Sequence, residues 1–298
     1  MRSILDTISA KIRSKRTLNG LKIDEHKVQP LSIDVHSNMI VPYLKVGFAQ
    51  SIGKQREHNE DSLYVFNTTI ISNNILSQFG LYIIADGMGG HQYGEIASNV
   101  AVRTLAKGLI KKIYLPILSS LSFPDQNTVE EIFRETVREA NREIIHFAPG
   151  GGTTLTALLI LGSRLTIAHV GDSRSYIIGE NGNTKLLTRD HSLVNRLVEL
   201  GQITNYEAAV HPQRNVLYRA LGQGEPFEPD INTTTLTESV YLLLCSDGLW
   251  GTLPETEMIN TVLASQDLQA TCNTLIDAAN DAGGSDNISL ILIKHSGE

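Results

Sequence analysis

From Lys45 onward, short apolar runs alternate with turn residues, a pattern that predicts a β-rich domain. We expect strands over 45–50, 62–71, 79–85, 154–161, 164–170, 174–179, 240–245 and 287–294. Gly162-Ser163 alone separates two of these runs, which predicts a β-hairpin. The stretch 67–78 reads as a long hairpin connection.

Helical periodicity predicts helices over 95–107, 129–147, 191–200, 254–264 and 267–282. Thr128 and Glu131 are spaced as a capping box at the start of the second of these helices, whose apolar stripe should face the core. Strands outnumber helices and come in runs. That order favours an α+β fold, with antiparallel sheets and helices packed outside them, over a parallel doubly wound sheet.

Residues 1–44 have a different character from the domain that we expect over 45–298. Between Met1 and Lys22 the chain carries many basic residues and one acid, Asp6, with apolar residues on one helical face. Such a helix can lie on an anionic membrane or dock on a partner. A solvated basic extension is the simpler interpretation and the one we favour.

Composition narrows the class of protein. The chain has 298 residues, is 41% hydrophobic and has a net charge of -7, so it can bury a large core and lacks the basic surface of a nucleic-acid binder. Its two cysteines form no disulfide framework or zinc motif. We find no membrane-spanning run and no apolar signal-peptide core, and we therefore expect a cytoplasmic protein.

Acidic residues at the ends of the expected strands are the main chemical feature. They are Glu60 and Asp61 before one strand, Asp86, Asp172 and Asp247 after others, and Asp286 before the last. Converging carboxylates would repel one another and be protonated unless a cation compensated them. Hard divalent cations such as Mg²⁺ or Mn²⁺ suit these oxygen ligands, whereas zinc is disfavoured because no His or Cys cluster accompanies the acids.

Several other hydrolase classes lack their motif here. A cysteine phosphatase needs Cys-x5-Arg, but Cys245 is followed at that spacing by Gly251, and Cys272 by Ala278. Neither a G-x-S-x-G elbow nor a P-loop occurs in the sequence.

At the strand-end acids and the segments around them, the sequence resembles the PP2C (PPM) family of metal-dependent protein serine/threonine phosphatases, in its bacterial-type form. The resemblance runs in order from Gly47 to Ile293 and is specific because many segments agree. Those segments are 56–62, 85–91, 152–154, 169–174, 188–192, 215–222, 245–250 and 285–288.

The resemblance implies a four-layer αββα sandwich with two Mn²⁺ or Mg²⁺ ions at one end and a third, weaker one beside them. Asp86 resembles the carboxylate that bridges both ions. Among the other ligands, Glu60 and the Gly87 carbonyl resemble those of one ion, Asp247 and Asp286 those of the other, and Asp172 with Asp247 those of the third.

The resemblance also implies the reaction. Phosphoserine and phosphothreonine would be hydrolysed by attack of a water or hydroxide that bridges the metals, with no covalent intermediate. Arg56 resembles the phosphate-binding residue, and Asp61 the group that orients this water. The implied partners are phosphorylated proteins, targets of a serine/threonine kinase, and the enzyme is expected to be a monomer.

Met88 departs from the eukaryotic pattern, which has a histidine there as general acid. Our hypothesis is that a metal-bound water donates the proton, with His91 the less favoured donor. A His91→Ala variant that lost rate selectively on poor leaving groups would contradict the water alone. Two alternatives to the phosphatase stay open: an inactive binding module, and a two-metal hydrolase of nucleotides or other small phosphoesters.

Residues near the acids also have structural interpretations. Arg174 is expected to be structural and to pair near Asp172, and His191 to cap a helix. Trp250 is expected in the core. Residues 192–224 would form the flap beside the site, a kind of segment that commonly governs substrate choice.

Overall fold

The computed structural model describes residues 43–72, 75–89, 92–120, 122–224 and 227–297. The predicted basic extension therefore lies outside the described residues, apart from its last two positions. No helix in the described ranges has the length and apolarity needed to cross a membrane. Both cysteines, Cys245 and Cys272, are buried and unpaired with each other.

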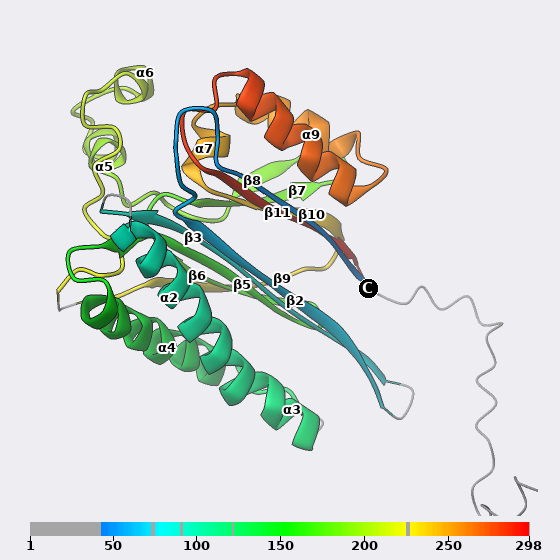
Figure 1. The fold of residues 1–298 in the computed structure, drawn as a ribbon. Coiled ribbons are helices and arrows are strands. Elements are labelled where there is room, and N and C mark those ends of the chain that lie inside the picture. Colours follow the sequence, from blue (N-terminus) through cyan, green and yellow to red (C-terminus); the bar gives the residue numbers. More distant parts are fainter. Residues whose placement is uncertain (1–42, 73–74, 90–91, 121, 225–226, 298) are drawn as a thin grey trace, which may run out of the picture. The chain divides into compact units, whose positions relative to one another are not determined.

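Two antiparallel sheets form the centre of the domain (Figure 1). The first has the order β1 (Leu44–Ser51), β11 (Ile288–Ser296), β10 (Ser239–Cys245), β7 (Arg174–Gly179) and β8 (Thr184–Leu186). The second has the order β2 (Asp61–Ser72), β3 (Ile75–Met88), β5 (Leu155–Leu161), β6 (Arg164–Val170) and β9 (Asp230–Thr235), and β4 (Gly152–Thr153) pairs with β3.

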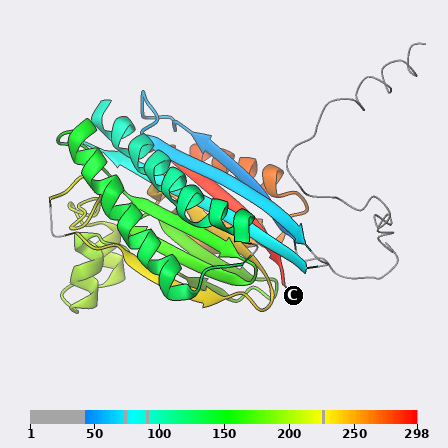
Figure 2. The same ribbon diagram turned by 90° about the horizontal axis from the view of Figure 1, so that it is seen from below.

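Helices cover the outer face of each sheet. On the second sheet lie α2 (Gln92–Leu109), the π-helical turn η1 (Ile110–Tyr114), α3 (Leu115–Ser120) and α4 (Gln126–Phe147); Figure 2 shows α2 and α4 side by side there. On the first lie α7 (Asp247–Trp250), α8 (Glu255–Leu263) and α9 (Leu268–Asp281). The four-layer αββα sandwich is therefore confirmed.

Alternation along β3 explains how one strand serves two layers. Leu81, Ile83 and Ala85 face the helices, whereas Tyr82 and Ile84 pack between the sheets. Side chains on successive residues of a strand point to opposite faces, and here both faces are covered. That is why the central strands read as continuous apolar runs.

The hairpin at Gly162 is confirmed: β5 and β6 pair directly, and Gly162 has φ +61°, a conformation that glycine adopts readily. Two details were wrong. Residues 67–78 are not a connection, because β2 and β3 stay paired from Asn67↔Gly80 to Ser72↔Ile75. Helix α4 begins earlier than predicted: the Asp125 side chain accepts hydrogen bonds from Thr128, so Thr128 is not the cap.

Candidate metal centre

Strand register brings the predicted acids to one end of the sandwich. Asp61 and Asp86 are direct partners across β2 and β3. Asp247 begins α7 immediately after β10, and Asp286 comes two residues before β11, the strand that pairs with β10. The charges of Asp61, Asp172, Asp247 and Asp286 all act on Asp86. These five carboxylates are therefore neighbours in the fold, whereas their role as metal ligands stays a prediction.

Hydrogen bonds from β4 and the residue after it fix the backbone at Asp86. The Asp86 amide donates to Thr154 Oγ1 at 2.9 Å, and the Asp86 carbonyl accepts from Thr153 Oγ1 at 2.8 Å and from the Thr154 amide at 2.8 Å. Every one of these contacts uses main-chain atoms of Asp86. Its carboxylate, which shares a hydrogen bond with Asp247, is therefore held in place within the centre.

Two carboxylate oxygens in the centre are buried and lack any hydrogen-bond partner. Asp61 Oδ2 accepts from Ser246 Oγ at 2.9 Å, but Asp61 Oδ1 has no partner, and neither has Asp247 Oδ1. A buried acceptor without a partner costs about 1–3 kcal/mol. Such a cost at two neighbouring groups points to a binding function rather than to fold stability.

The same surroundings raise the pKa of each carboxyl group. Burial raises the pKa of Asp61 to about 7, and the charges of Asp247 and Asp286 contribute to a lesser extent. Hydrogen bonds from Ser289 and Ser246 act in the opposite direction and lower this pKa. Burial and Asp286 raise the pKa of Asp247 to about 6. Burial and neighbouring acids also hold the pKa values of Asp86 and Asp172 well above their usual range. A bound cation would reverse this by stabilising the ionised forms.

These residues fit a hard divalent cation that keeps part of its water shell. Within the described residues, no three or more Asp, Glu, His or Cys side chains are grouped closely enough to hold a metal ion by themselves, so waters and backbone carbonyls would have to complete the ligand set. Mg²⁺ commonly binds through one or two carboxylates and retains several waters, and backbone carbonyls are further oxygen ligands. The donor set is all oxygen, which fits Mg²⁺ or Mn²⁺ and not a zinc-type site.

Glycine permits the close approach of Glu60. A Cβ atom on Gly94 would lie 1.9 Å from Glu60 Oε2, so no larger residue fits there without displacing that carboxylate. The Glu60 amide donates to Asn287 Oδ1 at 2.8 Å, and the Gly87 amide donates to the Glu60 carbonyl at 3.1 Å. Glu60 and Gly87, the two predicted ligands of one ion, are thus directly linked.

Arg56 lies at the mouth of the centre. Its Nη2 is 2.7 Å from Asp286 Oδ2, and its side chain is 47% exposed. The guanidinium also counteracts the raised pKa of Asp247. A planar cation in this position can bind phosphate oxygens in a bidentate manner.

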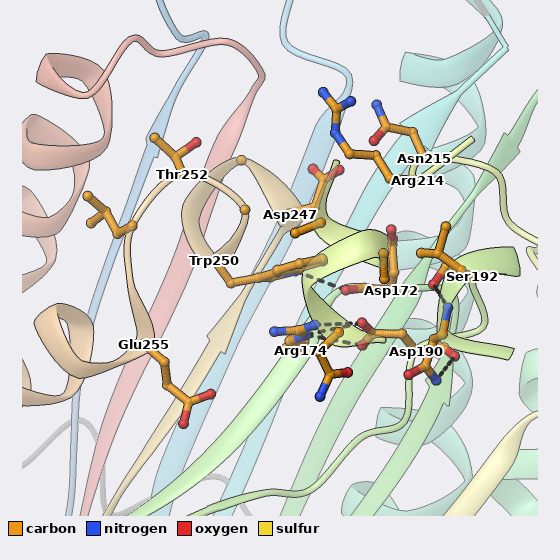
Figure 3. Close-up of a pocket in the computed structure, with 18 of the residues that line it drawn as sticks. Asp172, Arg174, Asp190, Ser192, Arg214, Asn215, Asp247, Trp250, Thr252 and Glu255 are labelled. Atoms are coloured by element: carbon orange, nitrogen blue, oxygen red, sulfur yellow. Dashed lines mark hydrogen bonds and ion pairs between the residues drawn. The ribbon is translucent and has the colours of Figure 1, made fainter. Parts of the chain in front are cut away.

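A pocket of about 760 Å³ adjoins Asp172 and Asp247 (Figure 3). Its walls come from the flap, which contains α5 (Leu193–Glu199) and α6 (Asn205–Ala209), and from α7 and the loop after it. Arg214 and Asn215 of the flap and Trp250 line it. The pocket leaves open space directly beside these two carboxylates.

Arg174 and Trp250 form one wall of this pocket. Arg174 donates to both oxygens of Asp190, and its guanidinium carbon lies 3.6 Å from the centre of the Trp250 ring. Trp250 Nε1 donates to the Asp172 carbonyl at 3.0 Å. Arg174 is structural as expected, but its ion-pair partner is Asp190. Trp250 is only partly in the core, since it also lines the pocket.

The interpretation of His191 as a helix cap was wrong. Ser192 caps α5, accepting a hydrogen bond from the Asn195 amide, whereas the His191 ring is buried and turned away toward β6 and β9. There it contacts the Gly171 amide and Asp230. Sequence reasoning missed Asp230 and Arg219, because only the fold brings them to His191. It also gave no role to Ser246, although this residue directly precedes Asp247 and binds Asp61.

The proton donor is not located. Met88 is the last residue of β3 and pairs with Gly152. His91 lies outside the described residues. The choice between a water and His91 therefore stays a prediction.

Comparison with known proteins gives one family. The model of the family "Protein phosphatase 2C" matches residues 47–288. "Serine/threonine phosphatase stp" of Listeria monocytogenes is 38% identical over 253 residues, covering 83% of this chain and 94% of that protein.

Comparison with solved structures also finds serine/threonine phosphatases. A serine/threonine phosphatase of S. agalactiae has a TM-score of 0.71 at 35% identity, covering 86% of this chain and 100% of that one. The catalytic domain of the serine/threonine phosphatase PstP, solved in complex with two manganese ions, has a TM-score of 0.68 at 29% identity, covering 85% and 98%.

Proposed function

Because the chain belongs to the protein phosphatase 2C family and is a serine/threonine phosphatase of its bacterial type, we propose that it hydrolyses phosphoserine and phosphothreonine in other proteins with two Mn²⁺ or Mg²⁺ ions at the carboxylate centre. The observation that carries the metal dependence is the pair of buried, unpartnered oxygens on Asp61 and Asp247. A similar protein binds two manganese ions, which supports the same requirement here.

The residues of the centre divide the work. Asp86 would bridge the two ions, Glu60 and the Gly87 carbonyl would hold one, and Asp247 and Asp286 the other. When bound, such ions lower the pKa of a water and neutralise the charge of the phosphoryl group. Asp172 would take part in holding a third ion, beside Asp247.

Asp61 and Arg56 act on the reactants rather than on the ions. Asp61 is anchored through one oxygen by Ser246, so its other oxygen is free to accept a hydrogen bond from the attacking water and to orient it. Arg56, exposed at the mouth, would leave Asp286 to bind the phosphate oxygens of the substrate, because a phosphate dianion offers it two acceptors.

The direct test is Mn²⁺-dependent phosphate release from a phosphothreonine peptide, with a nucleotide and an aryl phosphate for comparison. We expect release that needs metal and collapses in Asp86→Ala and Asp247→Ala. Preference for the nucleotide would favour the small-phosphoester alternative. No release on any of the three by folded, metal-loaded protein would favour the binding module.

A further inference from the structure

A network of polar side chains, buried at its histidines and partly exposed at Arg219 and Asp230, links the flap to the turn that carries Asp172. Its members come from β6, from both ends of the flap and from β9. His191 stands just before the flap and Arg219 near its end, and both contact Asp230 at the start of β9. Asp230 is therefore the point where these separate segments meet.

His191 holds the turn from both sides of Gly171. The Gly171 amide donates to His191 Nδ1 at 3.0 Å, and the His191 amide donates to the Gly171 carbonyl at 2.7 Å. Gly171 has φ +104°, and a Cβ atom there would lie 2.6 Å from the Thr154 side chain. The chain is thus tightly constrained at the residue immediately before Asp172.

The contacts of His191 determine its tautomer. An amide N–H can only donate, so Nδ1 must carry the lone pair and Nε2 must carry the proton. Nε2 lies 3.1 Å from Asp230 Oδ2, which accepts that proton. Arg219 Nη1 donates to the other oxygen, Asp230 Oδ1, at 2.7 Å. Arg219 Nη1 and His191 Nε2 lie 3.3 Å apart because both donate to the same carboxylate.

We propose that Asp230 is a positioning residue for Asp172: by fixing the tautomer of His191 it holds the Gly171-Asp172 turn, and so sets the affinity of the cation at Asp172. The inference rests on the proposed function, in which Asp172 helps to hold the third and weakest ion. Groups that orient a metal ligand typically contribute about 10–100-fold to metal affinity.

Asp230→Asn is a sharp test because an amide has only one acceptor oxygen. If that oxygen keeps the cationic donor Arg219, the amide nitrogen faces His191 Nε2. The proton of His191 then moves to Nδ1, where it opposes the Gly171 N–H, and the turn loses its hydrogen bond. The side chain keeps its shape, so packing changes little.

The experiment is calorimetric titration of the metal-free protein with Mn²⁺, together with ¹⁵N chemical shifts of the imidazole nitrogens. We expect Asp230→Asn to weaken the lowest-affinity class of sites by about 10-fold or more. We also expect it to shift His191 from the Nε2–H to the Nδ1–H form. The control Glu180→Gln removes one carboxylate charge from an ion pair with Lys294 beyond the far end of β7, and should change neither readout.

A double-variant cycle separates positioning from general damage. In an Asp172→Ala background, Asp230→Asn should have no further effect on Mn²⁺ binding. An additive effect, or an unchanged weak class in the single variant, would overturn the inference. If Asp230→Asn does not fold, His191→Leu is the substitute, since it removes the acceptor for Gly171; retention of the weak class there would equally overturn it.

The failure of this inference and of the proposed function can be told apart. Loss of the tight sites in Asp86→Ala supports the carboxylate centre whatever Asp230 does. An Asp172→Ala variant with wild-type Mn²⁺ binding would remove Asp172 from the ligand set, and the role of Asp230 with it. Loss of the weak class in Asp172→Ala, with none in Asp230→Asn, would reject the positioning role alone.

Discussion

The carboxylate centre and the polar network around His191 and its neighbour His169 lie on either side of the Gly171-Asp172 turn, and they satisfy their buried polar atoms in opposite ways. His169 pairs both ring nitrogens, with Thr156 and with the Arg189 carbonyl. Asp61 and Asp247 each keep an oxygen without a partner. Burial alone therefore does not mark a functional site, and neither does a single unpartnered atom, since the Tyr82 hydroxyl in the core also lacks a partner. The distinguishing sign is a group of neighbouring buried carboxylates that lack partners.

The largest expected contrast comes from making the same substitution in both regions. In metal-free protein above pH 7, Asp86→Asn should raise the melting temperature by about 3 °C or more, because it removes a carboxylate that burial and like charges oppose. Asp230→Asn should lower it, because Arg219 and His191 lose a charge-assisted partner. Thermal melts in EDTA measure both.

For activity we expect the opposite order, with Asp86→Asn the more damaging of the two variants. Asp86→Asn should lower kcat/KM on the order of 10³-fold, the scale of losing a main electrostatic stabiliser, whereas Asp230→Asn keeps the tight sites and loses less. An Asp86→Asn protein that is less stable than wild type without metal would show that the carboxylate is already satisfied, against the contrast drawn above.

The two regions should also respond oppositely to pH. The folded-state pKa of Asp61, about 7, lies above its unfolded value, so its contribution to stability is complete below about pH 4 and is lost as pH rises toward 7. Burial lowers the pKa of His169 to about 3, so its contribution is present above about pH 6.5 and is lost on acidification.

Melting temperature against pH, with and without Mn²⁺, separates these effects. Each pKa unit is worth about 1.4 kcal/mol, or roughly 3–6 °C for a domain of this size. The loss toward neutral pH should disappear when Mn²⁺ is present, whereas the loss on acidification should persist. A Mn²⁺ effect of equal size at pH 5 and pH 8 would contradict the assignment of the carboxylates.

The smallest expected effect concerns the pocket wall that Arg174 and Trp250 form. Arg174→Lys keeps the charge but loses the fork to Asp190 and the stacking on Trp250, so we expect destabilisation by about 0.5–1 kcal/mol with metal affinity little changed. Trp250 is the only tryptophan of the chain, so its fluorescence reports the change directly. An unchanged emission spectrum would show that the stacking contributes nothing.

Apolar runs and strand-end acids carried most of what the sequence could predict. Strands such as β6 and β7 match their predicted bounds, since each contains a mostly buried run rich in apolar residues that turn residues bound. β9 was missed because Asp230–Thr235 is a polar strand at the edge of its sheet. A strand with so little buried apolar surface has no hydrophobic pattern to detect.

The site was predictable where a residue acts through its own chemistry, and not where it acts through a distant partner. Glu60, Asp86, Asp247 and Asp286 stand at strand ends that the sequence displays. The role of Asp230 depends on His191, which is far away along the chain and joins it only through the packing of β6 against β9. No local pattern encodes such a meeting.

Gln269 has a consequence for how separate molecules meet. β1 is the outer strand of its sheet, and the Gln269 side-chain amide there accepts from the Phe48 amide and donates to the Phe48 carbonyl. An open strand edge invites another chain to add to the sheet, the first step toward aggregation. At this rung a single side chain from α9 already occupies the place of the incoming strand, so a neighbour at high protein concentration finds no free pair of groups to join.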